Sequence, residues 1–153
     1  MKAMNALILT AATLITAMTA PAVLAHSDEV LDTQKAPNGG QLRMAGPNHY
    51  ELVLVKDAKE VRENPVVVYV TDHAGQKITT AGASGTATIL SGKLKAAATL
   101  KPDGDNRMKG VAKYASTPDT KVVVSITLAG KPPEQARFTP LVVAKDTHTD
   151  HTH

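Results

Sequence analysis

The feature that most constrains the fold of this chain is a two-residue alternation of side chains, repeated in short runs that end at turn residues. In the run HYELVLVK, residues 49–56, Tyr50, Leu52 and Leu54 share one side and the residues between them share the other. Successive side chains of a β-strand point to opposite faces, so this period is typical of strands. No stretch shows a sustained helical period. The pattern therefore predicts an all-β fold.

Turn residues divide the chain into short strands, with Pro65 opening the run that begins at Val66. We predict a first strand beginning at Gln41, followed by strands over 49–56, 66–70, 76–80, 84–90, 94–100, 107–114, 121–128 and 135–142. About seven to nine strands at this spacing are typical of a β-sandwich, here an immunoglobulin-like or cupredoxin-like Greek key. The runs 66–68 and 122–124 are apolar throughout, so we expect them in the centres of the two sheets.

Composition limits both the core and the chemistry of this domain. The chain has no cysteine, no tryptophan and one phenylalanine, so its core must be built mainly from aliphatic side chains. The lack of cysteine excludes disulfides and thiolate metal sites. A net charge of +3, without any block of like charge, does not indicate a nucleic-acid partner.

The first 25 residues resemble a secretory signal peptide. Lys2 is followed by a mostly apolar stretch from Leu7 to Ala22, and Val23-Leu24-Ala25 fits the cleavage box of a signal peptidase. The apolar stretch is too short and too rich in threonine to favour a membrane anchor. We therefore expect cleavage after Ala25, export to the periplasm of a Gram-negative bacterium, and no membrane span afterwards.

The predicted organisation has four parts. A signal peptide over 1–25 is followed by a polar, flexible arm over 26–38, a β-sandwich domain over 39–143 and a histidine-rich tail over 144–153. We expect the arm and the tail to be disordered, because they are polar and show no period.

Histidines are the residues most suited to carry chemistry here. His26 would become the first residue after cleavage, and its amine and Nδ1 could then chelate Cu(II) in a six-membered ring. His49 begins a strand, and Asp72-His73 ends one ahead of Gly75, where loops gather at a domain rim. Each position also has a plain interpretation: an accidental first residue, a polar strand edge, and an ordinary turn.

The tail THTDHTH contains three more histidines, His148, His151 and His153. Short histidine-rich tracts are typical of metal binding, although a solvated tail without a role is the alternative. We therefore include these three residues among the candidate metal ligands.

Enzyme motifs are missing from the chain. It has no HExxH helix, no GxSxG elbow and no cysteine nucleophile. Copper monooxygenases pair an N-terminal histidine with a second one on a β-sandwich, but this chain is short for that task. We predict that the protein is not an enzyme.

The blocks APNGGQLRMAG, HYELVL, VYVTDHAGQKITTAGASGTATIL and ARFTPL resemble a family of small exported proteins associated with bacterial heavy-metal resistance, whose members resemble domains near metal-efflux adaptors. These blocks cover most of the predicted domain. The family pattern begins APHGG, so Asn38 replaces one of its histidines, whereas His49 and Asp72-His73 match. The resemblance implies a metal-binding role and an efflux complex as partner.

These observations predict a periplasmic metal-binding protein that buffers its ion or delivers it to an efflux complex. Copper is the expected ion, with zinc and nickel as alternatives. The second hypothesis is an immunoglobulin-like interaction module without a metal site, which docks on another envelope protein through an edge strand. Metal stoichiometry distinguishes the two hypotheses.

Overall fold

The computed structural model describes residues 26–142. The predicted signal peptide and the tail histidines His148, His151 and His153 lie outside the described residues, so both remain predictions.

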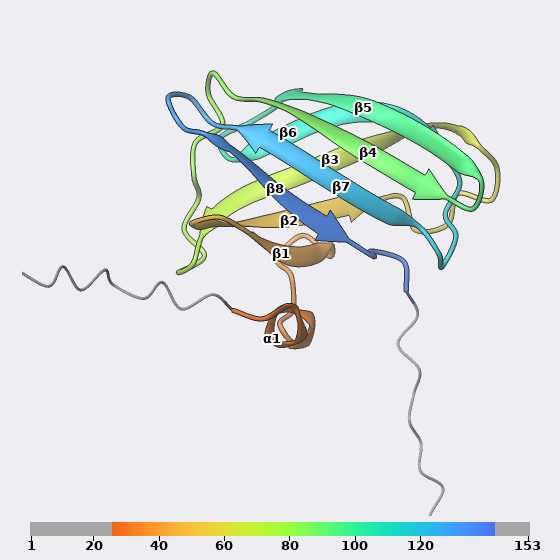
Figure 1. The fold of residues 1–153 in the computed structure, drawn as a ribbon, viewed down its shortest axis with the longest axis horizontal. Helices are drawn as coiled ribbons and strands as arrows, with labels where there is room; N and C mark the ends of the chain where they lie inside the picture. The colour runs from red at the N-terminus through yellow and green to blue at the C-terminus, as the bar shows by residue number, and fades with distance from the viewer. Residues whose placement is uncertain (1–25, 143–153) are drawn as a thin grey trace, which may run out of the picture.

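Eight antiparallel strands and one short helix make up the described part of the chain (Figure 1). The elements are α1 (Asp28–Thr33), β1 (Gln41–Ala45), β2 (Asn48–Leu54), β3 (Arg62–Asp72), β4 (Ser84–Ser91), β5 (Leu94–Pro102), β6 (Arg107–Tyr114), β7 (Lys121–Thr127) and β8 (Pro133–Phe138). The all-β prediction is confirmed.

All eight strands belong to one sheet, in the order β1-β2-β3-β6-β5-β4-β7-β8. Strands β4, β5 and β6 follow one another as hairpins, and β6 returns to lie beside β3, which is a Greek-key arrangement. The sheet curves into a nearly closed barrel (Figure 1). Its two edges approach each other without pairing as strands, and the backbone N–H of Thr139 after β8 donates to Oε1 of Gln41 in β1 at 2.9 Å.

The prediction of two stacked sheets is not confirmed, because β5 connects the two halves. It pairs with β4 along most of its length and with β6 at Lys101 and Pro102. Gly110 of β6 permits this close approach, since a Cβ there would lie 2.4 Å from the carbonyl oxygen of Thr99. A side chain at this position would push β5 and β6 apart.

The alternation seen in the sequence places one side of each strand inside the barrel. Tyr50, Leu52, Val66 and Val68 are fully buried there, and β7 contributes Val122, Val124 and Ile126. The residues between them, such as Val67 and Val123, are only partly buried. The all-apolar runs 66–68 and 122–124 lie in β3 and β7, each of which has a neighbouring strand on both sides, and only one face of these strands reaches the core.

Pro65 lies inside β3 rather than at its start. The β2 ladder ends at the pair Leu54 and Val66, so a missing N–H at Pro65 breaks no bond of that ladder. Instead, the Tyr114 hydroxyl donates to the Pro65 carbonyl at 2.7 Å and accepts from the N–H of Val55 at 3.0 Å. The tyrosine continues the hydrogen bonding beyond the end of β2.

Two further predicted strands differ from the structure. Residues 76–80 form only an isolated bridge between Thr71 and Lys77, and the N–H of Thr80 already donates to the carbonyl of Asp105, outside β3, at 2.9 Å. The last strand ends at Phe138 instead of residue 142, since Pro140 has no N–H to continue the ladder.

Residues 26–38, expected to be a flexible arm, are packed against the sheet. Leu31 of α1 is 1% exposed, and Ala36 is also buried. Arg43 of β1 contacts Asp32 at 2.7 Å through Nη1 and lies 3.6 Å from Asp28 through Nε. One buried leucine and one arginine between two acids thus anchor a segment whose polar composition gave no sign of packing.

Candidate metal centre

His49 lies near the start of β2, on the face opposite Tyr50 and therefore on the outside of the barrel. It pairs with Met44 of β1 and Thr71 of β3. Its side chain is nevertheless buried, with the residue 5% exposed. The cover comes from the folded N-terminal segment and the turn after β3, both of which lie over this outer face.

His73 is presented by the tight turn that follows β3. The Asp72 carboxylate accepts hydrogen bonds from the N–H of Ala74 at 2.9 Å and of Gln76 at 2.8 Å through the same oxygen, Oδ1. Gly75 closes the turn with a φ of +79°, which glycine adopts without strain. The predicted turn chemistry is thus present, and it fixes the backbone that carries His73.

His26 precedes the helix that brings it to the sheet. Ser27 is the N-cap of α1, and its hydroxyl accepts from the N–H of Val30 at 3.4 Å. The anchoring of α1 by Arg43 and Leu31 therefore also sets the position of His26.

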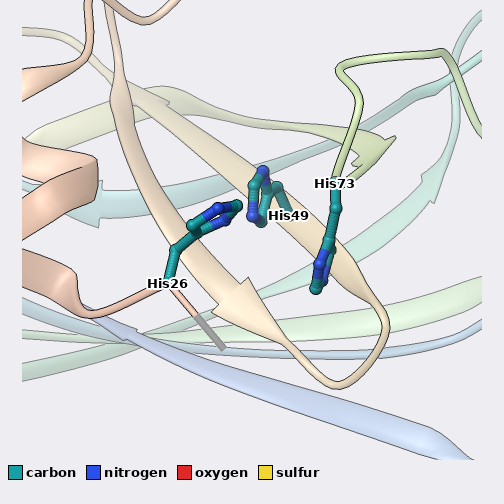
Figure 2. A group of neighbouring side chains, drawn as sticks. All are labelled: His26, His49 and His73. Carbon is teal, nitrogen blue, oxygen red and sulfur yellow. The ribbon is translucent and has the colours of Figure 1, made fainter. Parts of the chain in front are cut away.

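The three imidazoles form one cluster (Figure 2). One nitrogen from each of His26, His49 and His73 lies within 4.8 Å of the others. The rings of His49 and His73 stack with centroids 4.8 Å apart, and the His26 ring lies 5.6 and 5.7 Å from them. Three imidazole nitrogens at this separation can bind one metal ion between them after small adjustments of the side chains.

Each of the three histidines has one buried nitrogen without a hydrogen-bond partner in the described part of the chain. Nδ1 of His26, Nε2 of His49 and Nε2 of His73 are buried and make no hydrogen bond within the described residues. Buried polar atoms are normally hydrogen-bonded, and leaving one unpaired costs about 1–3 kcal/mol. A ligand bound among the three rings would supply partners for such nitrogens.

The surroundings of His49 favour its uncharged form. Burial lowers the pKa of His49 from its ordinary value of 6.5, and the neighbouring His73 and His26 lower it further, against an opposing effect of Asp72. A neutral imidazole offers a lone pair to a metal, whereas a protonated one offers none.

A cavity of about 440 Å³ adjoins the cluster and is lined by all three histidines. Glu51, two residues after His49 on the same face, lies at its wall and is 3% exposed. Its carboxylate accepts from the N–H of Asn38 at 2.8 Å, the amide of Asn38 at 2.9 Å and the N–H of Gly40 at 3.0 Å. Glu51 therefore fastens the N-terminal segment over β2.

Sequence reasoning missed Glu51 as a site residue. The alternation does place it on the same strand face as His49, but that face reads as solvated when the polar segment before β1 is taken to be a flexible arm. If that face had been expected to be buried, a carboxylate on it would have been unusual and therefore a candidate for a functional role.

Of the seven candidate ligands, the structure brings together His26, His49 and His73. Asp72 does not belong to the cluster, because its Oδ1 caps the turn. It lies close enough to act on the pKa of His49, which agrees with a supporting role.

Comparison with known proteins gives no match to a family model, a curated protein or a solved structure. Between residues 26 and 142, no helix is long and apolar enough to cross a membrane.

Proposed function

We propose that this chain is a periplasmic metal-binding protein that holds one divalent ion, Cu(II) first of all, between His26, His49 and His73. The observation that carries the proposal is the cluster of three imidazoles, each with one nitrogen within 4.8 Å of the others and each with one buried nitrogen that has no hydrogen-bond partner within the described residues. His148, His151 and His153 of the tail would add weaker binding capacity.

The donor set determines which ions are suitable. Imidazole is a good ligand for copper, zinc and nickel, and Cu(II) has the highest affinity among the divalent ions of the first transition row. Zinc and nickel are the alternatives. The site lacks thiolates, since the chain has no cysteine.

Cleavage after Ala25 belongs to the same proposal, because it would give His26 a free α-amine. Nδ1 of His26 is buried and has no hydrogen-bond partner among the described residues. Only Nδ1 can close a six-membered chelate ring with the amine of its own residue. With Nδ1 free of hydrogen bonds, a processed His26 would offer the ion two nitrogen donors.

The role of the bound ion follows from where the site lies. His26 and His73 are partly exposed at the rim of a surface cavity, so an ion could enter and leave without unfolding of the barrel. Such a site suits buffering, or delivery to an efflux complex in metal resistance, rather than a permanent structural role.

The test is a titration of residues 26–145 with Cu(II) and Zn(II), by calorimetry in a non-coordinating buffer. Removing 146–153 eliminates the tail histidines from the measurement. We expect one tight ion per chain, and a loss of at least about tenfold, or 1.4 kcal/mol, for at least two of the variants His26→Ala, His49→Ala and His73→Ala. Lys93→Ala, in the turn between β4 and β5, is the matched control and should bind as the parent does.

Equal binding by all three histidine variants would contradict the proposal. The remaining function would then be the interaction module that docks on another envelope protein. Comparing the processed full chain with residues 26–145 separately measures what the tail contributes.

A further inference from the structure

The protein donors of the candidate site are all uncharged. Three neutral imidazoles, and the α-amine in a processed chain, leave a divalent ion with its double positive charge. The Asp72 carboxylate, which is close enough to act on His49, accepts two backbone hydrogen bonds in its own turn. A partly buried double charge is costly unless an anion accompanies it.

The cavity beside the cluster is larger than a metal ion requires. Its volume of about 440 Å³ lies in the range of small-molecule sites. Two lysines, Lys35 and Lys77, line it, and Glu51 is the only acidic residue among the described residues that form its walls. Because the Glu51 carboxylate already accepts three hydrogen bonds, it is not free to turn towards the ion.

The remaining walls distinguish between kinds of anion. Leu42, Pro37 and Ala74 provide apolar surface, and Tyr69 provides an aromatic ring. An inorganic anion would leave this surface without a partner. An organic carboxylate would place its charged end between the metal and the lysines and its carbon chain against the apolar walls.

We propose that this cavity binds a small organic carboxylate, which serves as the anionic ligand of the metal held by His26, His49 and His73. The inference rests on the proposed function, because the carboxylate binds to the metal-loaded site. Lys35 and Lys77 supply charge complementarity to the carboxylate and do not contact the metal.

The test uses the processed full chain with His148→Gln, His151→Gln and His153→Gln, so that the tail cannot bind the ion. Cu(II) is added in a perchlorate medium, and sodium butyrate is then titrated while the visible absorption and electron paramagnetic resonance spectra of Cu(II) are recorded. We expect a saturable spectral change with butyrate and no butyrate binding to the metal-free protein by calorimetry.

The lysine variants test the cavity itself. Lys35→Gln and Lys77→Gln should each weaken butyrate binding about two- to fivefold, as expected for exposed charges, with little effect on Cu(II) affinity. Lys93→Gln, which is remote from the cavity, should change neither quantity.

Four outcomes would overturn part or all of these proposals. Tight Cu(II) binding without a saturable response to butyrate overturns the carboxylate site and leaves the proposed function intact. A butyrate response that is unchanged in both lysine variants overturns the role of the cavity. Sodium phosphate that binds as tightly as butyrate overturns the preference for an organic anion. Absence of Cu(II) binding overturns the proposed function and this inference together.

Discussion

At the scale of single residues, each histidine of the cluster has a buried ring nitrogen that makes no hydrogen bond within the described residues. His49 is the most buried of the three histidines, and its pKa is lowered first by burial and then by His73 and His26. Leaving buried nitrogens unpaired costs free energy in the folded protein, and the proposed ion would recover that cost on binding.

The lowered pKa of His49 predicts a pH dependence of the metal-free protein. Below about pH 6.5 the unfolded chain binds a proton at His49 more readily than the folded chain does, so the free energy of unfolding falls as pH decreases from 6.5 towards the lower pKa of the folded state. Above about pH 6.5 this residue contributes no pH dependence. Urea unfolding between about pH 7.5 and about pH 5 measures the effect.

The matched variant is His49→Gln, which should show a smaller decrease over the same range. An equal decrease in both proteins would mean that other groups cause it. Metal affinity should weaken in the same range, because protons compete for the imidazole nitrogens.

At the scale of elements, two contacts hold the N-terminal segment over β2. Arg43 binds Asp32 of α1, and Glu51 binds the backbone at Asn38 and Gly40. Neither residue belongs to the three-histidine cluster. Both set the distance between His26 and the two histidines that come from the sheet.

Arg43→Met should lower metal affinity without removing a ligand. Methionine keeps much of the side-chain volume but cannot bind Asp32 or Asp28, so α1 would loosen and His26 would be positioned less firmly. Cu(II) affinity should fall towards that of His26→Ala. In the double variant with His26→Ala, the arginine change should have little further effect, because the two act through the same ligand.

Additive losses in that double variant would show that Arg43 acts elsewhere. Circular dichroism of Arg43→Met should still show the β-structure of the parent, which separates a local effect from unfolding.

Glu51→Gln should destabilise the metal-free protein by about 1–3 kcal/mol, because one oxygen that accepts from Asn38 is replaced by an NH₂ group that faces another donor. Glu63→Gln, on the exposed side of β3, is the control and should change stability by less than about 0.5 kcal/mol. Equal denaturation midpoints for the two variants would contradict the role assigned to Glu51.

At the scale of the whole molecule, one curved sheet encloses an aliphatic core. The core contains one phenylalanine, Phe138, and the inward residues of β7 are Val122, Val124 and Ile126. Because the strands face the barrel interior with one side only, adjacent residues in the same run differ in their effect on stability.

Val124→Ala should cost about 1–3 kcal/mol, since it leaves a cavity at a fully buried position. Val123→Ala, on the partly buried outer face, should cost distinctly less. Guanidinium unfolding of the two variants provides the comparison. A larger loss of stability for Val123→Ala than for Val124→Ala would mean that Val123 faces the core and Val124 faces outwards.

The sequence by itself determined the local structure. The alternation of side chains predicted β6 with its observed bounds and placed β2, β4, β5 and β7 to within a few residues, because side chains of period two suit a strand with one buried face. The chemistry of Asp72 and Gly75 likewise predicted the turn that carries His73. The residue types able to bind a metal were also evident.

Only the tertiary structure decided what these elements build. The return of β6 to β3 and the link through β5 make one nearly closed, barrel-like sheet instead of two sheets, and such long-range pairing has no local signature. The packing of Leu31 and the contacts of Arg43 turned a polar arm into a cover for the outer face of β2. Residues that are distant in sequence form this cover over His49. The sequence could therefore only suggest that His49 lies close to His26 and His73. The long-range packing decided that the three histidines lie together.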